Sequence, residues 1–66
     1  MMEKITIIGG GSWGTAIAQL FANNGHEVLI YVRDEELKKN INELNLNTRY
    51  FPEIKLSERI RATDYL

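Results

Sequence analysis

The 66-residue chain contains no cysteine and only one histidine. Without cysteine it can form neither a disulfide framework nor a thiolate metal site, and a single histidine cannot complete a structural zinc site. We therefore expect no bound metal. A domain of this length buries only about 60% of the surface that its unfolded chain exposes, so its stability must come from the packing of a small core.

An excess of charge of either sign is also lacking, since eight basic residues accompany nine acidic ones, giving a net charge of −1. A nucleic acid or an anionic membrane surface requires a concentrated basic face, so neither is an expected partner. The first apolar run stops after a few residues at glycines, which is too short for a signal peptide or a membrane-spanning helix. We expect a cytoplasmic protein with no membrane insertion.

The first structured segment is a β-branched run, residues 5–8, without polar alternation. This pattern is typical of a parallel strand buried on both faces. A helix is predicted from about Ser12 to Asn24, and Gly25 supplies the left-handed residue that ends helices. Large side chains recur along this helix at spacings of three and four, which predicts that their face packs on the core. They are Trp13, Ile17, Leu20, Phe21 and Asn24.

A second apolar run, residues 27–32, has strand length and follows the predicted helix, so the two strands should be parallel with a right-handed crossover. Asp34 is a suitable N-cap for a second amphipathic helix. Its apolar stripe is Leu37, Ile41 and Leu44. Residues 48–58 are expected to form an ordered loop anchored by the apolar side chains of Tyr50, Phe51 and Ile54. Residues 60–63 are expected to form a short third strand.

Together these elements predict an α/β chain of Rossmann type, βαβαβ, which is the first part of a doubly wound parallel sheet. Two right-handed crossovers in the same direction place both helices on one face of the sheet. The other face and the edge of the first strand are then expected to be uncovered. Such surfaces favour self-association of the isolated chain.

Between the first strand and the helix, residues 9–14 read Gly-Gly-Gly-Ser-Trp-Gly and fit the pattern G-x-G-x-x-G. Gly9 allows the tight turn, Gly11 lets the backbone approach a pyrophosphate, and Gly14 permits close packing of the helix on the strand. The pyrophosphate would bind N–H groups at the positive end of the helix dipole. A purely structural turn is the alternative, but the flanking strands favour dinucleotide binding.

Arg33 and Asp34, after the second strand, bear on the choice of nicotinamide cofactor. In this fold an acidic residue here hydrogen-bonds the adenosine ribose, whereas an arginine suits the 2′-phosphate of NADPH. Arg33 favours NADPH, with a solvated surface arginine as the alternative. Asp34 could accept a ribose hydroxyl, but it is better placed to cap the following helix. NADPH is therefore the preferred cofactor, with NADH as the alternative.

The run Ser-Trp-Gly-Thr-Ala at residues 12–16, directly after three glycines, resembles the opening of the bacterial NAD(P)-dependent glycerol-3-phosphate dehydrogenases. The likeness covers essentially the whole chain. It continues at residues 24–28, 33–34, 41–42, 49–52 and 62–64. Phe51 departs from the family pattern, in which leucine is usual, but it preserves an apolar side chain.

The resemblance implies contacts with the cofactor for Ser12 and Trp13 beside the phosphate turn, for Arg33 at the adenosine end and for Tyr50 from the loop. On the residues alone, Trp13 and Tyr50 are better explained as core or as a loop anchor. The single histidine, His26, lies in the turn before the second strand and is interpreted as structural.

The resemblance also implies the reaction, in which dihydroxyacetone phosphate is reduced to sn-glycerol 3-phosphate by hydride transfer from NAD(P)H for phospholipid synthesis. The family's catalytic lysines and the residues that hold the phosphorylated substrate lie beyond residue 66. We therefore expect residues 1–66 to be the N-terminal part of a larger NAD(P)-binding Rossmann domain, without catalytic residues and inactive alone. The alternatives are another Rossmann dehydrogenase, a stand-alone nucleotide-binding module and a purely structural or interaction fragment.

Overall fold

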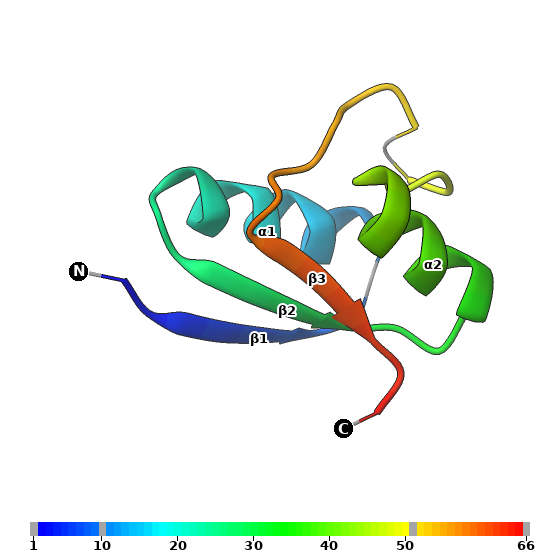
Figure 1. Cartoon of the computed structure of the whole chain (residues 1–66), viewed down its shortest axis with the longest axis horizontal. Coiled ribbons are helices and arrows are strands. Elements are labelled where there is room, and N and C mark those ends of the chain that lie inside the picture. Colours follow the sequence, from blue (N-terminus) through cyan, green and yellow to red (C-terminus); the bar gives the residue numbers. More distant parts are fainter. Residues whose placement is uncertain (1, 10, 51, 66) are drawn as a thin grey trace.

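The computed structural model describes residues 2–9, 11–50 and 52–65, so Gly10 of the predicted phosphate turn and Phe51 lie outside the described residues. The elements are β1 (Lys4–Ile8), α1 (Ser12–Asn23), β2 (Glu27–Tyr31), α2 (Glu35–Leu44) and β3 (Ile60–Thr63). All three strands are parallel, in the order β1-β2-β3 (Figure 1). The predicted Rossmann-type βαβαβ arrangement is confirmed, including its short third strand.

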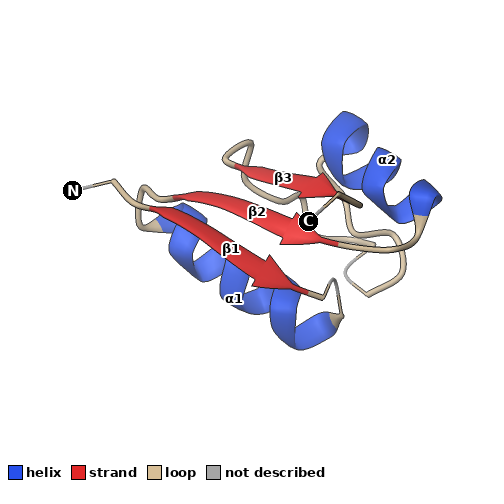
Figure 2. Ribbon diagram, turned by 90° about the horizontal axis from the view of Figure 1, so that it is seen from below, coloured by secondary structure: helices blue, strands red, loops and turns tan. Residues whose placement is uncertain are grey.

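Both helices cover the same face of the sheet. Ile7 of β1, Ile30 of β2 and Ala62 of β3 are in register, so their side chains point to one face. Ile30 and Ala62 are buried, and Ile7 packs against the same core. The helices contribute Ala18, Ala22, Leu37 and Ile41 to this core. α1 packs mainly against β2, and α2 lies against β3 (Figure 2).

The opposite face of the sheet is open. Thr6, Leu29 and Arg61 are in register there, and all three are exposed. Ile8 at the end of β1 is 70% exposed. The burial of β1 on both faces that its apolar run predicts is therefore wrong for this chain. The open face and open edge of β1 that the two crossovers predict are found instead, because β1 is an edge strand and none of the described residues covers its second face.

The predicted core face of α1 is also wrong. Trp13 is 82% exposed and Leu20 is 61% exposed, whereas the residues that face the sheet are small. These buried residues are Thr15, Ala18 and Ala22. Ile17 and Asn24 are exposed as well, and of the predicted set only Phe21 packs against the core.

Close packing of α1 on the sheet explains this inversion. A β-carbon added at Gly14 would lie 2.3 Å from the carbonyl oxygen of Gly9 and 3.4 Å from Cγ2 of Ile7. At such a short separation there is no space for a large side chain on the inner face of the helix. Small residues fit there, and three large apolar residues, Trp13, Ile17 and Leu20, are left on the outer face.

The second helix begins as predicted. The Oδ1 atom of Asp34 accepts hydrogen bonds from the backbone N–H groups of Glu36 at 2.9 Å and Leu37 at 3.1 Å. The helix ends at Asn45, which adopts a left-handed conformation with φ of 57°. Its predicted apolar stripe is only partly buried, since Leu37 and Ile41 are in the core but Leu44 is exposed.

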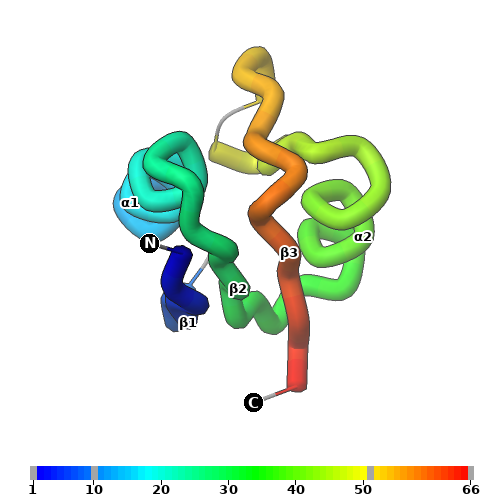
Figure 3. The backbone as a smooth tube through the Cα atoms, turned by 60° about the vertical axis from the view of Figure 1, so that its left-hand side comes forward, coloured from blue at the N-terminus to red at the C-terminus, as the bar shows by residue number. Residues whose placement is uncertain are grey.

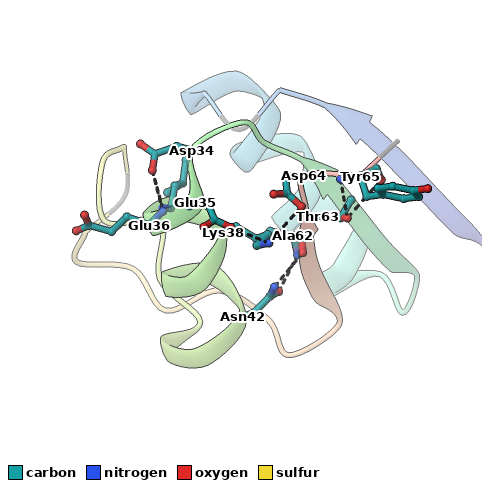
Figure 4. Close-up of polar contacts among 10 residues, drawn as sticks. Asp34, Glu35, Glu36, Lys38, Asn42, Ala62, Thr63, Asp64 and Tyr65 are labelled. Carbon is teal, nitrogen blue, oxygen red and sulfur yellow. Dashed lines mark hydrogen bonds and ion pairs between the residues drawn. The ribbon is translucent and has the colours of Figure 1, made fainter.

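The outer edge of β3 is paired by a side chain of α2. The amide of Asn42 donates to the carbonyl oxygen of Ala62 at 2.9 Å and accepts from its N–H at 2.8 Å (Figure 4). Lys38 pairs with Asp64 at 3.2 Å, and this contact raises the pKa of the lysine. Side-chain pairing of this kind covers an edge that could otherwise accept another strand.

The segment between α2 and β3 passes between α1 and α2 (Figure 3) and is held mainly by a buried asparagine. The Nδ2 atom of Asn47 donates to the hydroxyl of Thr15 at 2.6 Å. Its Oδ1 atom accepts from the N–H groups of Arg49 at 3.2 Å and Tyr50 at 3.1 Å. Leu56 is the buried apolar anchor.

Tyr50 and Ile54, two of the apolar anchors predicted for this loop, are both exposed. The prediction is wrong for these two residues, because the described part of the loop is attached through polar groups and through a later apolar residue, Leu56. Phe51, the third predicted anchor, lies outside the described residues. Within the described part of the chain, neither helix is long and apolar enough to cross a bilayer.

The contact at Gly14 predicts that Gly14→Ala destabilises the chain by about 1–3 kcal/mol, the usual cost of overpacking. Urea unfolding followed by circular dichroism measures this change. Gly11→Ser is the matched control, because a β-carbon at Gly11 meets nothing within 4 Å. Serine is also a favourable N-cap, so this control should not lower stability. Equal stability of the two variants would contradict the close approach of α1.

The buried amide predicts that Asn47→Ala lowers stability by about 1–3 kcal/mol, because three buried or partly buried polar groups lose a partner. Asn40→Ala is the control, since the Asn40 amide donates to the Thr48 hydroxyl at 3.0 Å in an exposed bond. That substitution should change stability by less than about 0.5 kcal/mol. If thermal unfolding gave similar losses for both variants, Asn47 would not be the anchor of this loop.

Candidate cofactor-binding site

A cleft of ≈ 350 Å³ opens at the carboxyl ends of β1 and β2. This is the place where parallel α/β sheets bind their ligands. Four of the seven predicted site residues line it, namely Gly9, Gly11, Arg33 and Tyr50. The remaining wall comes from Ile8, Tyr31, Val32, Asp34, Leu37 and Arg49.

In the turn between β1 and α1, the two described glycines that line the cleft are Gly9 and Gly11. Gly9 has a φ of +110°, a conformation that favours glycine. Its N–H donates to the carbonyl oxygen of Tyr31 at 2.9 Å, which holds the turn against the end of β2. A β-carbon added at Gly9 or Gly11 would meet no protein atom of the described residues within 4 Å. The space beside this backbone is therefore free for a ligand.

The two helix N-termini at this edge of the sheet differ in how they are capped. Gly11, the N-cap of α1, provides no side-chain hydrogen bond, and the first turn of α1 contains no acidic residue. In α2 the carboxylate of Asp34 occupies the corresponding position, and Glu35 and Glu36 follow. An anion is therefore favoured at the N-terminus of α1 and disfavoured at that of α2.

The structure places Ser12 and Trp13 on the first turn of α1, exposed beside the cleft but outside its lining. Arg33 is exposed and follows β2, and Tyr50, which also lines the cleft, is 44% exposed. The interpretation of Trp13 and Tyr50 as core residues is therefore wrong. Gly14 contributes the close helix contact rather than the lining.

Asp34 has two structural roles that use both of its oxygens. Oδ1 caps α2, and Oδ2 accepts from Nη2 of Arg49 at 2.5 Å. The backbone hydrogen bond from Leu37 is the largest effect on the pKa of Asp34 and lowers it. Partial burial opposes this effect, and the charge of Arg49 lowers the pKa further, so that the net shift is downward. The predicted capping role is confirmed (Figure 4).

Three residues that matter at this site were not singled out from the sequence. Thr15 and Asn47 are 32 positions apart, and no local pattern connects them. Arg49 was noticed only within the family resemblance. Its guanidinium bonds to Asp34 because of the path that the loop takes, and the sequence does not reveal that path.

His26 is structural, as predicted. Its Nδ1 atom accepts from the N–H of Glu3 at 3.0 Å, and its ring lies edge-on to Phe21. Among the described residues, no group of three or more histidine or acidic side chains is placed to hold a metal ion.

A family model and individual relatives with similar sequences point to the same protein family. Over residues 4–66 the chain matches the family described as NAD-dependent glycerol-3-phosphate dehydrogenase N-terminus. It is 57% identical over 63 residues to a glycerol-3-phosphate dehydrogenase (NAD(P)+) of Halothermothrix orenii, a match that covers 96% of this chain and 18% of the relative. A Lactococcus lactis protein of the same name is 48% identical over 64 residues, covering 97% and 19%.

Solved structures agree with this result. Glycerol-3-phosphate dehydrogenase from Coxiella burnetii superposes with a TM-score of 0.83 at 32% identity, over 91% of this chain and 18% of that one. The enzyme of the same name from Saccharomyces cerevisiae gives 0.82 at 34% identity, over 92% and 21%. The chain thus spans about a fifth of the length of these relatives. It belongs to the NAD-dependent glycerol-3-phosphate dehydrogenase family, of which it matches the N-terminal part.

Proposed function

We propose that this chain is the dinucleotide-binding part of an oxidoreductase that interconverts dihydroxyacetone phosphate and sn-glycerol 3-phosphate. The observation that supports this most strongly is the cleft at the ends of β1 and β2, where the glycine turn, Arg33 and Tyr50 come together. When bound, the nicotinamide cofactor supplies or accepts the hydride. The role of these residues is to bind and orient it.

The glycine turn fits a pyrophosphate for two reasons. The open space beside Gly9 and Gly11 lets a ligand approach the backbone, which a side chain would prevent. The uncapped N-terminus of α1 then provides N–H donors and a favourable dipole for the negative charge. Ser12 and Trp13 lie on the same first turn and would contact the cofactor beside the phosphates.

NADPH is the preferred cofactor in this proposal. Recognition of a ribose diol in this fold requires a carboxylate that can accept its hydroxyls. Both oxygens of Asp34 already accept hydrogen bonds from the protein. Arg33 lines the cleft and is exposed, so its guanidinium is available for a 2′-phosphate. Tyr50 would contact the cofactor from the loop between α2 and β3.

The proposal assigns catalysis and the binding of the small phosphorylated substrate to parts of a longer protein. None of the residues of this chain is assigned a catalytic role. A cytoplasmic location is part of the proposal.

Titration with NADPH tests the proposal directly. Trp13 is the only tryptophan in the chain and is highly exposed beside the glycine turn. We expect saturable quenching of its fluorescence at cofactor concentrations up to about 1 mM, which corresponds to weak binding. No turnover of dihydroxyacetone phosphate should accompany this binding.

Free tryptophan amide, titrated in parallel, corrects for light absorbed by the cofactor. Gly11→Val is the matched variant, because its side chain has room in the fold but occupies the space in which the pyrophosphate approaches the backbone. It should retain the far-ultraviolet circular dichroism spectrum and lose the quenching. A chain whose corrected fluorescence does not respond to NADPH would refute the cofactor-binding proposal.

The isolated chain is also expected to self-associate, because large apolar side chains are exposed on the outer face of α1 and at the edge strand. Sedimentation velocity should show a sedimentation coefficient that rises with concentration. Leu20→Lys should weaken this dependence, whereas Asn40→Lys adds the same charge on α2, away from the outer face of α1, and should not. A monomer at all concentrations would argue against association.

A further inference from the structure

Two guanidinium groups and one carboxylate line the same cleft, from Arg33, Asp34 and Arg49. The carboxylate pairs with one of the two cations, since Oδ2 of Asp34 accepts from Nη2 of Arg49 at 2.5 Å. Within the described part of the chain, the guanidinium of Arg33 makes no hydrogen bond or ion pair. One positive charge of the cleft is thus compensated by the protein, and one is not.

The ion pair between Asp34 and Arg49 can be broken easily by a competing anion. The side chains are 30% and 59% exposed, respectively, and ion pairs in such positions are weak because water competes for both charges. Arg49 belongs to the segment that Asn47 fixes through the N–H groups of Arg49 and Tyr50. The backbone position of Arg49 therefore does not depend on its ion pair, and its guanidinium can change partners.

The geometry points to Asp34 and Arg49 as the residues that set how strongly this cleft distinguishes NADPH from NADH, an inference that rests on the proposed cofactor site. Arg49 is a second ligand for the 2′-phosphate, and Asp34 competes with that phosphate for it. A phosphate carries between one and two negative charges near neutral pH and pairs well with the planar fork of arginine. The Asp34 carboxylate also repels it directly.

At position 34 a substitution can separate the effect of the negative charge from the effect of the helix cap. Asparagine caps helices as well as aspartate does, so Asp34→Asn keeps an acceptor for the N–H groups of Glu36 and Leu37. It removes only the negative charge and the competition for Arg49. The variant should therefore bind NADPH more tightly while its affinity for NADH stays almost constant.

The alternative is that the ion pair only fastens the loop from which Tyr50 lines the cleft. In that case its loss would weaken both cofactors together. The ratio of the two dissociation constants distinguishes these roles, because NADPH and NADH differ only in the 2′-phosphate.

The experiment titrates the 66-residue chain with NADPH and with NADH, following the fluorescence of Trp13. Asp34→Asn should raise the preference for NADPH by about three- to tenfold, as expected for removing one charge several ångströms from a phosphate in water. Arg49→Gln should lower the preference by a similar factor. In the double variant the gain from Asp34→Asn should be reduced, because part of it acts through Arg49.

Asp64→Asn is the matched control. It removes a carboxylate from an exposed ion pair with Lys38 that lies outside the cleft, so the NADPH preference should stay within about twofold. If both cofactors bind but Asp34→Asn and Arg49→Gln change their ratio no more than this control does, the inference is wrong. If the unmodified chain binds neither cofactor, the proposed function fails and the inference fails with it.

Discussion

The backbone of α1 lies so close to the end of β1 that Gly14 has no space for a side chain. This single contact fixes where the helix begins relative to the sheet. It brings the N–H groups of the first turn to the edge at which the strands end, and it holds the glycine turn beside the cleft. It also restricts the inner face of α1 to small residues, so that Ala18 and Ala22 form the core contact.

The elements of the fold were predictable because each has a local cause. Runs of β-branched residues give the strands, Asp34 caps α2, and Gly25 with a φ of +93° ends α1. The burial of α1 was not predictable from its periodicity. Large and small residues both repeat along this helix, and the separation between helix and sheet decides which set faces inward. That separation is a tertiary property, although the glycine at position 14 was its one local sign.

The site was predictable to different degrees along the chain. The glycine turn and Arg33 follow from a motif whose spacing is set by a strand, a turn and a helix. Tyr50 was placed only through family resemblance, because a loop has no periodicity from which its path can be read. The buried amide of Asn47 and the pairing of Arg49 with Asp34 depend on that path, so neither had a local signal.

The amide of Asn42 determines at which edge the sheet can accept a further strand. It occupies both backbone polar groups of Ala62, and the N–H of Ile60 is bonded to the carbonyl oxygen of Ser57 at 3.1 Å. A strand approaching β3 would have to displace these bonds before forming its own. At β1 no such substitute is present among the described residues. Extension of the sheet, whether by a longer polypeptide or by a second copy, is therefore favoured on the side of β1, next to the nucleotide turn.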